Sequence, residues 1–133
     1  MNVLLDTTVL IDVLKGDTAA VGKVEELREN SVVYTSSVNI YEILRGIKLL
    51  PSNQERHLAA LRLLISNVHL LEFDLKAAEE ASNIYATLRK KGIAIDHPDY
   101  LIAGVSLANG VNTIITRNEK HFKKVPGMKV VSY

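Results

Sequence analysis

The sequence predicts an α/β fold, in which a mostly parallel central sheet of four to five strands lies between two layers of helices. Short apolar runs typical of buried strands recur along the chain, and segments with helical spacing separate most of them. Strands that alternate with helices form right-handed βαβ units, which make the strands parallel and place helices on both faces. The 133 residues contain no linker, repeat or low-complexity tract, so we expect a single domain over 1–133.

The first half of the chain is predicted to carry two strands and several helices. Asn2–Leu5 is a short apolar run, and "SVVYT" at Ser31–Thr35 is rich in residues that favour strands. Ser36 or Ser37 can cap the helix that follows the second strand, and Pro51 ends that helix. The predicted helical segments are Thr8–Leu14, Ala19–Glu29, Val38–Leu49 and the amphipathic Gln54–Ser66.

The second half is predicted to carry three strands and two helices. Val68–Phe73 reads as a strand, and Asp74 caps a helix over Leu75–Lys91 that Gly92 terminates. "HPDYLIAGVSLANG" predicts a helix with Pro98 at its first position and Gly110 at its end. "NTIITRN" predicts a strand that leads into a turn, and "MKVVSY" predicts the last strand.

Composition and charge narrow the class of protein. Apolar residues make up 47% of the chain and the net charge is +1, which is typical of a globular protein rather than a disordered one. The absence of cysteine excludes disulfides, thiolate metal sites and thiol nucleophiles. We find neither a signal peptide nor an apolar run long enough to span a membrane, so we expect a cytoplasmic protein with no membrane partner.

Asp6 follows the first predicted strand directly, although aspartate is depleted in strands and costly to bury unpaired. Ligands of parallel α/β sheets bind beyond the carboxyl ends of the strands, where Thr35–Ser37 and Thr116–Asn118 are also expected. Asp6 is therefore a candidate site residue. The structural alternative is that it caps the next helix or pairs with an arginine.

Three further acids make a site at this edge more plausible, although each has a structural alternative. Glu42 lies within "SVNIYEILRG", where Asn39, Glu42 and Arg45 could instead form a polar surface stripe. Asp96 and Asp99 begin a strongly apolar helix, where the helix dipole alone favours acids. The small residues Ala103 and Gly104 suggest that this helix packs closely on the sheet and carries Asp99 inward.

The sequence resembles the PIN-domain ribonucleases, specifically the stand-alone VapC toxins of VapBC toxin–antitoxin systems. The matching segments are "LLDTTVLID", "YEILRG", "FDLKAAEEASNIYATLRKKGIAI", "DYLIAGVSLANG" and "TIITRNEKHF", which together cover essentially the whole chain. The resemblance implies a PIN domain that cleaves RNA endonucleolytically. It also implies a homodimer and a VapB-type antitoxin as partner.

The resemblance also implies roles for individual residues. Asp6, Glu42 and Asp99 match the three core acids, which are the expected catalytic residues and metal ligands, and Asp96 matches a further acid of the family. Thr116 matches a threonine at the end of the fourth strand. Many PIN nucleases have an acid two residues after that threonine, but this chain has Asn118, and Asp96 or Glu119 is available to supply the missing charge.

Clustered carboxylates require a cation. Two carboxylates about 4 Å apart repel by about 4 kcal/mol at an effective dielectric constant of 20. Mg²⁺, or Mn²⁺ in its place, reverses this repulsion because both ions prefer oxygen ligands. Such an ion activates water and binds phosphate oxygens, so the acids predict hydrolysis of a phosphodiester.

Basic residues close to the acids are candidates for RNA binding. Arg45 follows Glu42 on its helix, and Arg117 and Lys120 belong to the basic segment "RNEKHFKK". The alternative is that these are solvated helix ends. The histidines show no metal-ligand spacing, and His97 is interpreted as a residue at the helix entrance.

The sequence lacks residues that two other classes of α/β protein require. A receiver domain needs a lysine after its last strand, and a haloacid-dehalogenase phosphatase needs an acid where Thr8 stands; the sequence has neither. A non-catalytic binding module on the PIN scaffold is the remaining alternative. Only Asn118 favours it.

Overall fold

The computed structural model describes residues 1–133 and contains a five-stranded sheet in which every pair of neighbouring strands is parallel. The strands are β1 (Asn2–Leu5), β2 (Val32–Ser36), β3 (His69–Leu71), β4 (Thr113–Ile115) and β5 (Lys129–Val131). Their order across the sheet is β3-β2-β1-β4-β5, so β1 lies at the centre. The predicted parallel α/β fold is confirmed.

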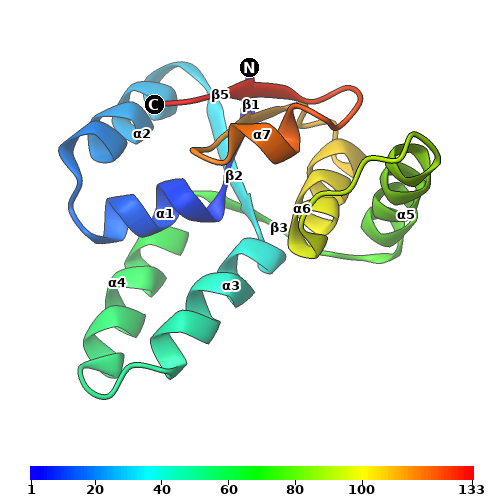
Figure 1. The fold of residues 1–133 in the computed structure, drawn as a ribbon. Coiled ribbons are helices and arrows are strands. Elements are labelled where there is room, and N and C mark those ends of the chain that lie inside the picture. The colour runs from blue at the N-terminus through cyan, green and yellow to red at the C-terminus, as the bar shows by residue number, and fades with distance from the viewer.

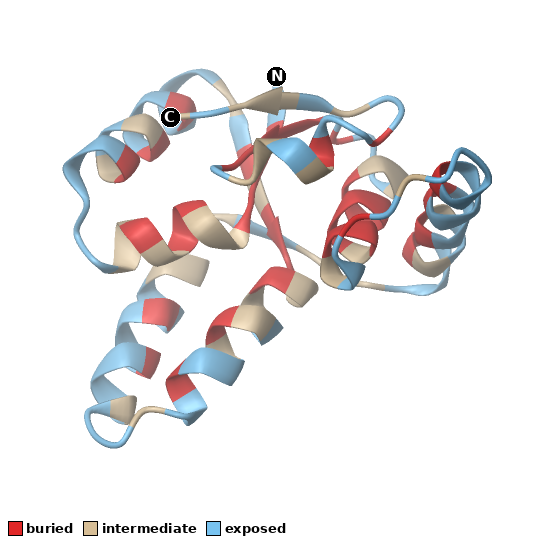
Figure 2. Cartoon of the chain, viewed as in Figure 1, coloured by how far each residue is buried: buried red, intermediate tan, exposed pale blue.

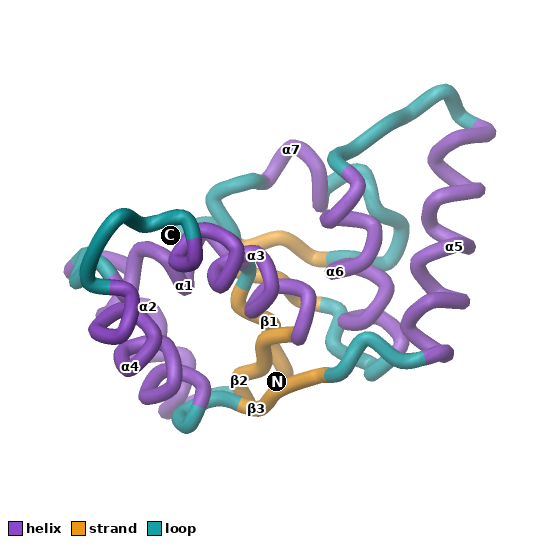
Figure 3. Tube along the Cα trace, turned by 90° about the horizontal axis from the view of Figure 1, so that it is seen from below, coloured by secondary structure: helices purple, strands orange, loops and turns teal.

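Seven helices connect the strands and cover both faces of the sheet (Figures 1 and 3). They are α1 (Thr7–Leu14), α2 (Thr18–Asn30), α3 (Ser37–Lys48), α4 (Gln54–Ile65), α5 (Leu75–Lys90), α6 (His97–Ala108) and α7 (Glu119–Phe122). Helices α1 to α4 lie on one side of the molecule, and α3 and α4 form a projecting hairpin (Figure 1). None of the helices is both long and apolar enough to cross a membrane.

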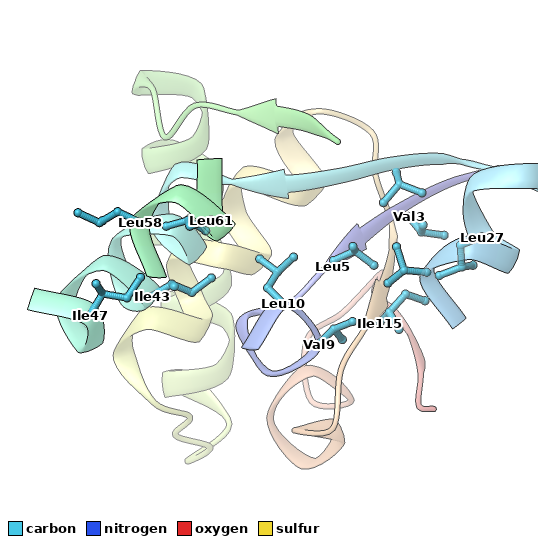
Figure 4. Close-up of a cluster of buried hydrophobic side chains, with 12 residues drawn as sticks. Val3, Leu5, Val9, Leu10, Leu27, Ile43, Ile47, Leu58, Leu61 and Ile115 are labelled. Atoms are coloured by element: carbon cyan, nitrogen blue, oxygen red, sulfur yellow. The ribbon is translucent and has the colours of Figure 1, made fainter. Parts of the chain in front are cut away.

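The central strand β1 contributes to a separate hydrophobic core on each face of the sheet. Val3 and Leu5 pack with side chains of α1, α2, α3 and α4 in one core (Figure 4). Leu4, which points to the opposite face, packs with side chains of α5, α6 and α7. Successive strand residues point to opposite faces of the sheet, and helices cover both faces, so Val3, Leu4 and Leu5 are all fully buried. Buried residues concentrate on the strands and on the inner faces of the helices (Figure 2).

Local sequence signals set the helix ends near the site. Ser36 and Asn39 form a reciprocal capping box at the start of α3, and Asp74 caps α5 by accepting from the Ala77 amide. Gly92 and Gly110, which follow α5 and α6, have positive φ angles of 71° and 73°. The predicted ends of these helices are therefore confirmed to within a residue or two.

Two details of the second half of the chain differ from expectation, although α6 does pack on the sheet through Ala103, which shares a core with Leu4 and Ile114. The turn after the fourth strand contains the short helix α7, which we did not predict. The close approach at Gly104 is made to α5 rather than to the sheet, because a Cβ at Gly104 would lie 2.6 Å from the Ala81 Cβ. Even so, α6 carries Asp99 inward, and only 7% of that residue is exposed.

Candidate active site

A polar cavity of about 450 Å³ opens at the carboxyl ends of the central strands. It is lined by Asp6, Thr7, Thr8, Glu42, Arg45, Asp96, His97, Pro98, Asp99 and Asn118. The structure thus brings together all four predicted acids, although they come from the end of β1, from α3 and from the start of α6. Arg45 and Asn118 also lie where the sequence placed them, beside these acids.

Asp6 is buried at the base of the cavity, with 3% of its surface exposed. Its carboxylate accepts hydrogen bonds from Thr116 Oγ1 at 2.7 Å and from Asn39 Nδ2 at 3.2 Å. It stands at the N-cap position of α1 but makes no side-chain capping bond, and it forms no ion pair. Both structural alternatives for Asp6 are therefore wrong.

Burial raises the pKa of Asp6 from 3.8 to about 6. The hydrogen bonds from Thr116 and from the Thr7 backbone oppose this rise in pKa, whereas the charges of Asp99 and Glu42 add to it. Desolvation outweighs the repulsion between carboxylates. The folded chain thus holds a carboxylate in a position that disfavours its charge and offers it no cationic partner.

Glu42 is held at the cavity wall by a chain of polar side chains. Thr7 Oγ1 donates to Glu42 Oε1 at 2.7 Å, and Asn39 Nδ2 donates to Thr7 Oγ1 at 3.0 Å. Asn39 is fully buried, so a polar surface stripe of Asn39, Glu42 and Arg45 is not what the structure contains. Arg45 forms no ion pair with Glu42, and its guanidinium lies 5.5 Å from the Tyr41 ring centroid.

Asp99 has a partner that the sequence analysis missed. His121 Nδ1 lies 2.5 Å from Asp99 Oδ2 and 3.9 Å from Asp96 Oδ2. Asn118 Nδ2 also donates to Asp99 Oδ2, at 3.2 Å. Burial raises the pKa of Asp99, and the hydrogen bond and charge of His121 oppose that rise. No local pattern in the sequence indicated this partner, because α7 has only four residues.

Thr116 and Asn118 form hydrogen bonds with the acids and with each other. Thr116 is fully buried, donates to Asp6 and accepts from the Asn118 backbone N–H at 2.8 Å. Of the two acids available to replace the missing charge at Asn118, Asp96 lines the cavity. Glu119 instead pairs with Lys123 at 3.2 Å.

Two of the three predicted RNA-binding cations lie outside the cavity lining. Both Nε and Nη2 of Arg117 lie 3.1 Å from the carboxylate of Asp12, whose second neighbour is the Tyr133 hydroxyl. The positive charge of Arg117 is therefore already paired. Lys120 is exposed on α7 and forms no ion pair, and Arg45 alone lines the cavity.

The donor set of the cavity fits a hard divalent cation. Four carboxylates face a shared space, and one of them is buried without a positive partner. Carboxylate oxygens are the ligands that Mg²⁺ and Mn²⁺ prefer, and a bound cation would offset the unfavourable burial of charge. This arrangement is suited to chemistry on a substrate that supplies phosphate oxygens.

Comparisons with known proteins agree with this description. The PIN domain family profile matches residues 3–128. The chain is 30% identical to the tRNA(fMet)-specific endonuclease VapC of Salmonella typhimurium, over 98% of this chain and 96% of that protein. Its fold is similar to that of VapBC2 from Rickettsia felis bound to a promoter DNA fragment, with a TM-score of 0.91, 24% identity and coverage of 100% and 99%. It is also similar to DNA-bound VapBC from Salmonella typhimurium, with a TM-score of 0.88, 26% identity and coverage of 99% and 98%.

Proposed function

Because this chain belongs to the PIN domain family, we propose that it is a metal-dependent endoribonuclease and the toxin of a type II toxin–antitoxin pair. The observation that carries the proposal is the cavity at the sheet edge, where Asp6, Glu42, Asp96 and Asp99 converge. The related VapC endonuclease supports RNA as the substrate class. A cytoplasmic location follows from that substrate.

Asp6, Glu42, Asp96 and Asp99 would hold Mg²⁺, for which Mn²⁺ can substitute. When bound, the ion supplies an activated water and a positive charge for the phosphate. Thr116 and Asn39 orient the Asp6 carboxylate, and Thr7 orients that of Glu42. Asn118 supports Asp99 through its amide. These neutral donors hold the acids in place without neutralising them.

Arg45 is the cation best placed to bind the RNA backbone, since it lines the cavity without an ion-pair partner. Lys120 adds positive charge on the exposed surface of α7, outside the cavity lining. Arg117 acts differently from our first expectation: its pairing with Asp12 fixes the chain just after Thr116. We therefore assign RNA contacts to Arg45 and Lys120 first.

An apolar groove beside the acids is the proposed antitoxin site. It has a volume of about 330 Å³ and lies between α1, α3 and α4, lined in part by Ile11, Ile43 and Ile47. Glu42 lines both this groove and the acidic cavity. An amphipathic antitoxin helix seated there would bring its flanking residues to the carboxylates, where an arginine would block metal binding. The VapBC complexes of similar fold support this partner.

We also propose that the toxin is a homodimer. Several large apolar side chains are exposed, among them Tyr41 at 61% and Leu75 at 76%. Light scattering at high micromolar concentration should give twice the mass of the chain. A monomer under those conditions would contradict the dimer.

A cleavage assay tests the nuclease. Wild-type protein should cleave single-stranded RNA with Mg²⁺ and lose that activity in EDTA, whereas Asp99→Asn should be inactive in both. Glu72→Gln is the matched control, because Glu72 is an exposed acid that does not line the cavity. Equal loss of activity in the control variant, or full activity in Asp99→Asn, would contradict the proposed site.

A further inference from the structure

His121 gives this site a nitrogen donor. One ring nitrogen of His121 and one carboxylate oxygen each of Asp96 and Asp99 all lie within 4.8 Å of one another. We propose that His121 binds a divalent metal ion directly, together with Asp96 and Asp99, and makes this position favour transition-metal ions over Mg²⁺. The inference rests on the proposed function, because it concerns the metal that serves the nuclease.

The position of His121 is set by the residue that follows it. The next residue, Phe122, is fully buried in the core on that face of the sheet, and it anchors α7. His121 is half-buried, with 24% of its side chain exposed, whereas 79% of the Asp96 side chain is exposed. The imidazole is thus held in place while the oxygen donor beside it remains open to an ion from solvent.

The imidazole contacts polar groups of this same site, because Asn118 Nδ2 lies 3.0 Å and Asp99 Oδ2 lies 2.5 Å from His121 Nδ1. His121 is the only basic side chain that pairs with Asp96 or Asp99, since neither acid has a lysine or arginine partner. The contact between His121 Nδ1 and Asp99 Oδ2, at 2.5 Å, brings a ring nitrogen and a carboxylate oxygen close enough to bind one ion. A divalent cation bound there would take the place of any hydrogen between these two atoms.

Nitrogen ligation has a consequence for selectivity. Mg²⁺ strongly prefers oxygen ligands, whereas first-row transition-metal ions accept imidazole readily. Asp99 belongs both to this group and to the carboxylates near Asp6 and Glu42. Asp96 likewise lines the acidic cavity, so an ion bound with His121 would lie next to Asp6 and Glu42 and share two ligands, Asp96 and Asp99, with the set proposed to hold Mg²⁺.

Mn²⁺ alone, without RNA, is the probe for the test. Pulsed electron paramagnetic resonance of the Mn²⁺-loaded protein should show ¹⁴N coupling in the wild type and none in His121→Asn. His97→Asn is the matched control and should keep the coupling, because His97 lines the same cavity but its ring packs on Tyr85 and Tyr100. His121→Asp, which supplies an oxygen donor, should bind Mn²⁺ without nitrogen coupling.

Affinities measured on the same variants provide a second readout. His121→Asn should lower the affinity for Co²⁺, which binds imidazole more strongly than Mn²⁺ does, at least tenfold and the affinity for Mg²⁺ less than threefold. Equal losses for both ions would show that His121 only positions Asp99, and would overturn the proposal. So would a wild type without ¹⁴N coupling, even if it cleaves RNA. Nitrogen coupling in a protein that cleaves no RNA would support His121 as ligand and contradict the nuclease.

Discussion

Replacement of Asp6 by asparagine should stabilise the protein when no metal is bound. The Asp6 carboxylate is buried, has no cationic partner and has a pKa raised to about 6. Asparagine has nearly the same shape and carries no charge. If Asp6 were a helix cap or an ion-pair partner, its replacement would lower the stability of the fold. The sign of the change in stability therefore separates a site residue from a structural one.

The magnitude follows from the pKa shift. A rise in pKa from 3.8 to about 6 is a rise of about 2 units, which corresponds to about 3 kcal/mol of lost stability once the group is ionised in both states. Because the folded-state pKa is the higher one, stability is fully present below pH ~4 and is lost as the pH rises through about 6. The asparagine amide cannot accept both of the Thr116 and Asn39 hydrogen bonds, which costs about 1 kcal/mol.

Thermal melts in EDTA test this prediction. The net gain of about 2 kcal/mol should raise the Tm of Asp6→Asn by about 8 °C at pH 7.5 and by much less at pH 4.5. Added Mg²⁺ should raise the wild-type Tm and leave the variant nearly unchanged. Asp17→Asn, which alters an exposed helix cap, should change Tm little at either pH. If Asp6→Asn melted below the wild type in EDTA and still responded fully to Mg²⁺, Asp6 would be a structural residue and not a metal ligand.

Further predictions concern single residues of the cavity and of the helix contacts. Glu42→Gln should lower kcat by about 100-fold or more with an unchanged Tm, and a loss below tenfold would count against its role. Gly104→Ala should cost about 1–3 kcal/mol in urea unfolding because of the 2.6 Å approach to α5, whereas Gly22→Ala, with open space around it, should gain about 0.5–1 kcal/mol. Arg45→Ala should reduce the salt dependence of RNA binding by about 0.7 in log–log slope at constant Tm. Arg117→Ala should instead lower Tm, because it removes the ion pair with Asp12. A lower Tm for Arg45→Ala and a smaller salt dependence for Arg117→Ala would show that Arg117 binds RNA and Arg45 supports the fold.

The architecture and the main acids could be predicted from the sequence because their signals are local. Apolar runs identify the strands, and parallel strands bring their carboxyl ends to one edge. Asp6 was therefore placed correctly from its position after β1 alone. Glu42 and Asp99 needed the family resemblance, since each taken singly also fits a helix surface.

The support around the acids could not be predicted, because it depends on contacts between distant segments. Asn39 and Asp6 are 33 positions apart, and nothing near Asn39 indicates that its amide is buried against a carboxylate. The Gly104 contact with Ala81 is likewise a property of how two helices cross. Periodicity reports which face of a helix is apolar but does not report its neighbour.

His121 was missed for a different reason. It belongs to a helix of only four residues, which is too short to show helical periodicity. Asp96 and Asp99, the two carboxylates beside it, lie more than 20 positions earlier in the chain. A search for histidine spacing within one segment therefore finds nothing.

We propose that the acidic cavity hydrolyses RNA with a water molecule activated by a divalent cation. The most direct measurement is cleavage of an RNA oligonucleotide in ¹⁸O-labelled water with Mg²⁺, followed by mass spectrometry of the product ends. We predict one ¹⁸O atom in the product phosphate and no products in EDTA or with Asp6→Asn. Unlabelled 2′,3′-cyclic phosphate ends, or cleavage that continues at full rate in EDTA, would contradict the account.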